Sequence, residues 1–162
     1  MATTPRSTSP TKSKAAPKEA IAILRADHKL VSELFAEVDK TRKPEKKMRL
    51  VEQICQELTI HAQVEEEIFY PAVKEALDDE ELVPEAQVEH ASLKALISEL
   101  EGAEGDDEMY DARVKVLSEY VKHHVKEEQN EMFPKVRETD LDLVELGVRI
   151  LQRKEELKSE LA

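Results

Sequence analysis

The sequence of 162 residues is poor in the residues that cross-link or interrupt a fold. It has one cysteine, three glycines, no tryptophan and 4% aromatic residues. A single cysteine excludes an internal disulfide and favours a reducing, cytoplasmic setting, and its position beside Ile54 predicts that Cys55 is a small buried side chain. No apolar run is long enough to span a bilayer, and the N-terminus lacks the apolar segment of a secretory signal.

An excess of positive charge is also lacking. The chain has 36 acidic and 24 basic residues, a net charge of −12. This balance argues against nucleic acid or an anionic membrane as a partner. Charged residues make up 37% of the chain and hydrophobic residues 40%. With so few glycines, that mixture predicts an all-α protein whose exposed helix faces carry the charges.

The order of apolar and polar segments predicts five helices after a tail. Residues 1–16, rich in Thr, Ser, Pro and Lys, are expected to be a disordered tail, followed by a bundle over 17–137 and a C-terminal helix within 138–162. The bundle helices are expected over about 17–41, 44–70, 84–101 and 108–133.

Three prolines and the last helix carry further expectations. Pro84 is expected to open the third helix, and Pro71 and Pro134 are expected to kink or end theirs. The last helix is expected to follow a cap at Thr139 or Asp140 and to become exposed or frayed from Arg153 onward. Its apolar face is expected to consist of Leu141, Val144, Val148 and Leu151.

Histidine and glutamate interrupt the apolar face of the second and fourth predicted helices. The stripe Val51, Ile54, Leu58 continues at the same spacing to His61 and Glu65, and the stripe Val114, Leu117, Val121 continues to His124 and Glu128. The two His-x-x-x-Glu pairs are 63 residues apart. An unpaired buried carboxylate costs several kcal/mol, so each glutamate needs a partner.

The first and third predicted helices complete an internal repeat. Each carries one histidine in its apolar stripe, and these two residues, His28 and His90, are 62 positions apart. Two helix hairpins of one pattern predict an up-down-up-down four-helix bundle with a pseudo-twofold axis. The six interrupting groups are then expected at similar depth in the core.

Four imidazoles and two carboxylates at one depth indicate a metal site. Structural zinc is disfavoured because no cysteine set is present, and the donor types suit iron or manganese. We assign His28, His61, His90 and His124 as terminal ligands and Glu65 and Glu128 as bridges between two ions. Which histidines share an ion is left open. About two of six positions on each ion are expected to remain for water, oxo, O₂, peroxide or NO.

These residues resemble the hemerythrin-like family with His-His-Glu cation-binding repeats. The matching segments are LRADH (24–28), HAQVEEEIFYP (61–71), Glu89-His90 and HVKEEQNEMFP (124–134), and the resemblance covers about residues 20–137. It implies a non-haem di-iron centre, oxo- or hydroxo-bridged, in an up-down-up-down bundle.

Two departures from the oxygen-carrying hemerythrins bear on function. Those proteins have a further histidine where this chain has Lys94, and they end the motif with His-x-x-x-x-Asp, where this chain has Gln129 and uses Glu128 instead. The resemblance is therefore closer to hemerythrin-like sensor domains and iron–sulfur-cluster repair proteins. It implies redox chemistry with peroxide or NO, or labile iron, more than stable O₂ carriage.

Residues beside the six ligands have weaker expectations. His123 is expected at the surface or next to the ligands, Glu66 and Glu127 could relay protons or replace a ligand, and Tyr120 could bring its hydroxyl to the site. Lys94 is expected either to reach solvent or to lie over the site. Core or rim packing is expected of Phe35, Phe69, Tyr70 and Phe133.

Three classes of function follow from this site. A binding or sensing protein would hold O₂ or NO in oxygen or iron sensing, an enzyme would decompose peroxide or reduce NO under oxidative or nitrosative stress, and an iron donor would serve iron–sulfur cluster repair. The short tail, in place of a cysteine-bearing domain, disfavours the donor. We expect a self-contained stress-response or gas-binding unit, monomer or dimer, that binds neither nucleic acid nor membrane.

Overall fold

The structure is a computed structural model that describes residues 19–78, 81–105 and 107–161, and within these ranges every regular element is a helix. The predicted tail over 1–16 lies outside them. In chain order the elements are α1 (Ala20–Lys40), α2 (Pro44–Val64), the π-helical η1 (Glu65–Phe69), α3 (Tyr70–Ala76), α4 (Leu82–Glu101), α5 (Glu108–Glu127), the π-helical η2 (Glu128–Met132), α6 (Phe133–Arg137) and α7 (Leu143–Leu161).

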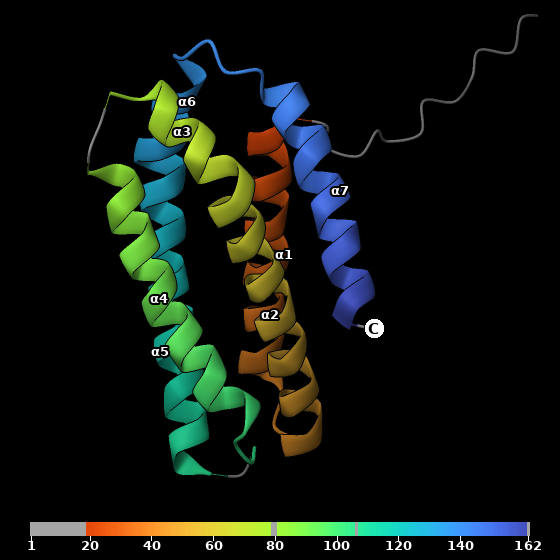
Figure 1. Cartoon of the computed structure of the whole chain (residues 1–162). Helices are drawn as coiled ribbons and strands as arrows, with labels where there is room; N and C mark the ends of the chain where they lie inside the picture. The colour runs from red at the N-terminus through yellow and green to blue at the C-terminus, as the bar shows by residue number, and fades with distance from the viewer. Residues whose placement is uncertain (1–18, 79–80, 106, 162) are drawn as a thin grey trace, which may run out of the picture.

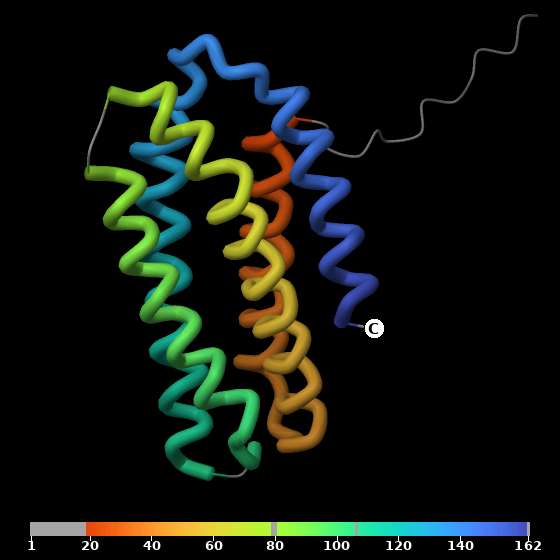
Figure 2. The backbone as a smooth tube through the Cα atoms, viewed as in Figure 1, coloured from red at the N-terminus to blue at the C-terminus, as the bar shows by residue number. Residues whose placement is uncertain are grey.

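Two antiparallel hairpins form the bundle. The first consists of α1 with the continuous rod α2–η1–α3, and the second of α4 with the rod α5–η2–α6 (Figure 1). The path alternates up and down, and the backbone trace in Figure 2 shows the two hairpins side by side. The predicted up-down-up-down bundle with a fifth C-terminal helix is confirmed.

Local sequence signals account for the helix starts. The side chain of Glu19 accepts a hydrogen bond from the Ala22 amide at 2.5 Å and caps α1, and Asp107 caps α5 through the Met109 amide at 3.0 Å. Pro44 opens α2, as predicted. The third bundle helix begins at Leu82 and holds Pro84 in its first turn, so the prediction of a start at Pro84 was two residues late.

A π-helical turn precedes each of the two bundle prolines. The Tyr70 amide bonds the Glu65 carbonyl and the Phe133 amide bonds the Glu128 carbonyl, each five residues back. Pro71 and Pro134 follow in the first turns of α3 and α6. A proline cannot donate to the carbonyl four residues back, and the wider turn before it takes up that mismatch. The rods therefore continue past both prolines and do not end there.

Helix α7 packs along the first hairpin. It contacts α1, α2 and η1, on the flank opposite to α4 and α5 (Figure 1). The predicted apolar face was wrong, because Val144 and Val148 are each 59% exposed and the buried residues are Leu146, Gly147, Ile150 and Leu157. The second half from Arg153 is mostly exposed, as predicted, but it is not frayed, since the helix continues to Leu161 and Leu157 is buried.

Two apolar clusters fill the interior on either side of the histidines. One gathers the start of α1, the end of the α2 rod and α7, and includes Leu24, Phe69, Phe133 and Ile150. The other gathers the C-terminal halves of α1 and α4 with the N-terminal parts of α2 and α5, and includes Phe35 and Cys55. The predicted burial of Cys55 is confirmed, and burial raises the pKa of its thiol to about 12. No described helix is both long and apolar enough to cross a bilayer.

Candidate metal centre

All six predicted ligands lie inside the bundle, between the two apolar clusters. Their exposed fractions range from 0% for Glu65 to 8% for His28. One histidine comes from each of α1, α2, α4 and α5, and the glutamates begin the two π-helical turns. The repeat in the sequence thus becomes a layer of imidazoles and carboxylates at one height.

The ligand atoms divide into two groups of three. One group contains His28, His61 and Glu128, the other contains Glu65, His90 and His124, and within each group the atoms lie within 4.8 Å of one another. Each pair of histidines comes from one hairpin, and the glutamate that joins it comes from the other. The question that the sequence left open, which histidines lie together, is answered by this grouping.

Each glutamate contacts one histidine of its own group and one histidine of the other group. Glu65 Oε1 is 2.9 Å from His61 Nε2 and 3.4 Å from His90 Nε2. Glu128 places Oε1 3.3 Å from His28 Nε2 and Oε2 3.2 Å from His124 Nε2. A carboxylate that faces both pairs of imidazoles is placed as a bridge between two ions would require.

Several of these atoms lack hydrogen bonds despite complete burial. They are His28 Nε2, His61 Nε2, both carboxylate oxygens of Glu65, His90 Nδ1 and Glu128 Oε1. Buried polar atoms without partners are costly, so such a cluster indicates a missing binding partner. Two ligand atoms on one ion, at bonds of about 2.1 Å and right angles, are about 3.0 Å apart. The separations above are close to that value, and the donor set fits a pair of transition-metal ions.

Three of the four imidazoles are hydrogen-bonded through Nδ1 by residues that were not predicted to belong to the site. Asp27 Oδ2 lies 2.9 Å from His61 Nδ1, Glu89 Oε1 lies 3.0 Å from His124 Nδ1, and the Gln129 amide nitrogen lies 2.9 Å from His28 Nδ1. Such partners fix ring orientation and donor strength in metal sites. A signal was available, because each of these residues adjoins a predicted ligand in the chain.

Tyr70, predicted to serve only packing, brings its hydroxyl into the cluster. The hydroxyl donates to Glu128 Oε2 at 2.7 Å and lies 3.2 Å from His90 Nε2 and 3.3 Å from His124 Nε2. Burial, with the nearby charges of Glu65 and Glu128, raises the pKa of Tyr70 well above its usual value, so the phenol keeps its proton. Tyr70 is therefore a proton-bearing neighbour of the His90 group.

Comparison with known proteins agrees with this geometry. The family model of the hemerythrin HHE cation-binding domain matches residues 19–136. The chain belongs to this hemerythrin family. The resemblance read from the sequence is thereby confirmed, and the buried His and Glu clusters make this a metal-binding hemerythrin-like protein.

Two relatives place the HHE chain among known proteins. A solved hemerythrin HHE cation-binding domain-containing protein from Mycobacterium kansasii shares the fold, with 24% identity, a TM-score of 0.75 and 88% of each chain covered. A DNA nickase from Nostoc sp. is 30% identical over 115 residues. That match takes in 71% of this chain and 32% of the relative, so the HHE chain spans about a third of that protein's length.

Helix α7 adds charge contacts to one side of the HHE site. Lys154 Nζ contacts Asp27 Oδ1, and both side chains are largely buried. One residue earlier, Arg153 binds Glu67 in the π-helical turn at 2.8 Å. The histidine His61 thus has a carboxylate and then a lysine behind it. A similar chain of contacts lies behind His90. Glu66 Oε2 is 3.9 Å from His90 Nδ1, and Glu66 in turn binds Lys94.

The remaining predicted neighbours lie farther out. Tyr120 was wrongly expected to approach the site, because it flanks the buried stripe of α5 and is 49% exposed. His123 has a side chain 65% exposed and lies 3.1 Å from Glu127 and 3.5 Å from Glu89. Glu127 therefore faces His123 at the surface, away from the buried ligands.

The protein groups hold protons where cations are expected. Burial lowers the pKa of His61, but Glu65 and Asp27 outweigh it and raise the net pKa well above the usual value. His124 behaves alike, and its neighbouring carboxylate Glu128 overcomes burial to raise the pKa to about 9. Burial raises the pKa of Glu128, yet the adjacent imidazoles of His124 and His28 bring it well below normal. Cations binding here would displace protons.

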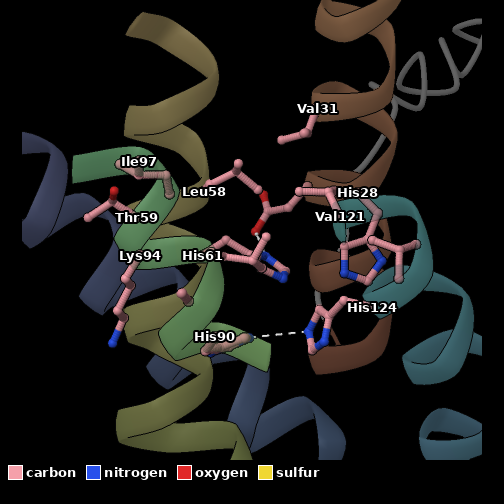
Figure 3. A pocket seen from close by; sticks show the side chains of 14 residues that line it. His28, Val31, Leu58, Thr59, His61, His90, Lys94, Ile97, Val121 and His124 are labelled. Atoms are coloured by element: carbon pink, nitrogen blue, oxygen red, sulfur yellow. Dashed lines mark hydrogen bonds and ion pairs between the residues drawn. The ribbon is translucent and has the colours of Figure 1, made fainter. Parts of the chain in front are cut away.

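A small apolar cavity of about 30 Å³ adjoins the four imidazoles (Figure 3). Its apolar lining consists of Val31, Leu58, Leu93, Ile97, Val121 and Val125, with Ala62. Lys94 also lines it, but Figure 3 shows the amine directed away from the imidazoles, in keeping with its bond to Glu66. The space admits a molecule of a few atoms.

Proposed function

We propose that this HHE chain holds two iron ions in the buried cluster and uses them to bind or react with O₂, NO or peroxide. The observation that carries the proposal is the convergence of six buried donors, several of them without hydrogen bonds. Manganese suits the same donors and is the alternative metal.

Each ion has a distinct set of protein groups in this proposal. His28 and His61 would hold one ion, and His90 and His124 the other. Glu65 and Glu128 would bridge the two, because each carboxylate contacts both histidine pairs. An iron pair supplies electron exchange and open positions for a small ligand.

The surroundings of the cluster favour small ligands. The cavity beside the imidazoles is apolar and holds about 30 Å³, which suits a diatomic gas or peroxide and excludes an organic substrate. The Tyr70 hydroxyl, which keeps its proton and is bonded to Glu128 Oε2, can donate a hydrogen bond to a ligand on the His90 side. That donor supports reaction with peroxide or NO, in a stress or sensing role, over reversible O₂ carriage.

DNA cleavage, the activity in the name of the Nostoc relative, is not proposed for this chain. The net charge of −12 repels a phosphate backbone, and the metal ligands are buried beyond the reach of a duplex. The shared third of that relative is consistent with a metal-binding domain attached to other functions.

Assays on iron-loaded protein test the proposal. The iron-loaded protein is expected to release O₂ from peroxide or to consume NO. The variant His61→Ala is expected to reduce that rate at least tenfold. An absorption band that appears in air and disappears under vacuum would instead assign O₂ carriage. Iron transfer to an apo iron–sulfur protein without either reaction would favour the donor role. Peroxide and NO rates equal to those of free iron, with neither O₂ binding nor iron transfer, would contradict the proposal.

A further inference from the structure

A second set of metal-type ligands lies at the surface, directly outside the buried cluster. Glu89, His123 and Glu127 each offer a ligand atom, and the three atoms lie within 4.8 Å of one another. His123 Nε2 is 3.1 Å from Glu127 Oε1 and 3.5 Å from Glu89 Oε2. Histidine with two carboxylates is a donor set that divalent transition metals accept.

This outer set is linked to the buried ligands through one shared carboxylate. Glu89 Oε1 bonds His124 Nδ1 at 3.0 Å, while Glu89 Oε2 faces His123. In the sequence, the pairs His123/Glu127 and His124/Glu128 are two interleaved His-x-x-x-Glu motifs, shifted by one residue. One pair faces the core and the other faces outward because neighbouring residues differ by about 100° around a helix.

The other half of the repeat lacks the outer pair. A shift of 63 positions places Ile60 and Val64 where the second half has His123 and Glu127. Ile60 and Val64 are buried in the apolar cluster that includes Leu146 and Ile150 of α7. Helix α7 packs mainly against the first hairpin, and the polar pair appears on the other hairpin.

A narrow cavity joins the outer set to the buried one. It holds about 10 Å³ between α4 and the α5–η2 rod, and its lining includes the exposed Glu85 and the half-buried Glu89 and Glu127. Its buried lining includes His124 and Glu128. Glu128 is 2% exposed, and its Oε1, which has no hydrogen bond, faces His28 Nε2 at 3.3 Å inside the buried cluster.

The two cavities differ in the charge of their linings. Four carboxylates line the narrow cavity, which raises the local concentration of cations. The apolar cavity beside the imidazoles has one carboxylate, Asp27, and one amine, Lys94, in its lining, so these two charges offset each other. The two sides of the site are therefore suited to different molecules, cations on one and neutral small ligands on the other.

We propose that Glu89, His123 and Glu127 form a surface site for a divalent cation, from which ions pass along the Glu89 and Glu128 carboxylates into the buried cluster. The proposal rests on the proposed function, because it supplies ions to that centre. The outer site has only three protein ligands and is largely exposed, so it holds a cation more weakly than the buried cluster does.

Metal-uptake kinetics test this proposal. Metal-free protein is mixed with Co²⁺ without oxygen, and the visible absorption of bound Co²⁺ is followed in time. With two Co²⁺ ions supplied per chain, which the stronger buried cluster takes up, the double variant His123→Ala/Glu127→Gln is expected to slow uptake at least tenfold while binding the same final amount of Co²⁺ as wild type. Glu33→Gln, which removes one exposed carboxylate from α1, is the control and is expected to keep the wild-type rate.

The outcomes separate this proposal from the proposed function. Uptake within twofold of wild type in the double variant, or equal slowing in Glu33→Gln, would overturn the surface site. A reduced final amount of bound Co²⁺ would also overturn it, since the three residues would then belong to the buried centre. Absence of Co²⁺ binding by the wild-type protein would instead contradict the buried metal centre itself.

Discussion

At the scale of single residues, the imidazoles depend on partners that are their neighbours in sequence but serve another helix. Asp27 precedes His28 and bonds His61, while Glu89 precedes His90 and bonds His124. A carboxylate behind an imidazole fixes the ring and strengthens its donor nitrogen. The affinity of the site therefore resides in these residues as well as in the ligands.

Asp27→Asn is expected to weaken metal binding about 10- to 100-fold, because His61 loses its charged acceptor. Competition with a chromophoric chelator measures the affinity. Asp39→Asn, at an exposed position of the same helix, is the matched control and should retain the wild-type affinity. Equal affinities of the two variants would mean that Asp27 has no part in holding the metal.

The raised pKa values of His61 and His124 predict how the stability of the metal-free protein depends on pH. A group whose pKa is higher in the folded state stabilises the fold fully below its unfolded value, about 6.5 for histidine, and loses that effect as pH rises through the folded value. The folded pKa of His124 is about 9.

Thermal unfolding of the metal-free protein is therefore expected to show a melting temperature that falls between about pH 6.5 and pH 9. Metal-loaded protein should show no such fall, since cations replace the protons. A metal-free melting temperature that rises over this range would contradict the proton-holding cluster.

The positions of Tyr70 and Tyr120 show where reading the sequence residue by residue fails. In an uninterrupted α-helix Tyr70 would point about 140° away from Glu65, and a packing role was the prediction. The π-helical turn from Glu65 to Phe69 adds a residue to the turn and brings the hydroxyl over the site. Nothing in the sequence apart from Pro71 marks that turn, and the same uniform α-helical spacing placed Tyr120 at the site.

At the scale of elements, the four bundle helices could be predicted and the docking of α7 could not. The bundle helices each carry a single apolar stripe that leads to a ligand. Helix α7 carries two apolar stripes. The prediction placed the stripe through Val144 and Val148 in the core, but the structure buries Leu146, Ile150 and Leu157 instead. Which stripe is used depends on the surface that α1 and α2 present, which is tertiary information.

Leu157→Ala tests the observed face of α7. Leu157 is 5% exposed, so its truncation is expected to lower the free energy of unfolding by about 2–4 kcal/mol. Val148→Ala, on the exposed stripe, should change it by less than about 0.5 kcal/mol. Urea unfolding provides both values, and the reverse order would restore the face predicted from sequence.

At the scale of the whole molecule, two similar hairpins enclose one site. A further helix, α7, packs mainly against one of these hairpins. The repeat of 62 and 63 residues was sufficient to predict the pairing of hairpins and the six inward groups. The asymmetry was not predictable, because it arises from α7 packing mainly on the first hairpin. That asymmetry leaves His123 exposed and Glu127 half-buried on the other half.

The metal content of the purified, iron-reconstituted protein tests the central claim most directly. Elemental analysis with Mössbauer spectroscopy is expected to give two iron ions per chain in a coupled pair, as six convergent donors with two bridging carboxylates imply. A folded protein that retains no iron or manganese after anaerobic reconstitution would contradict the account.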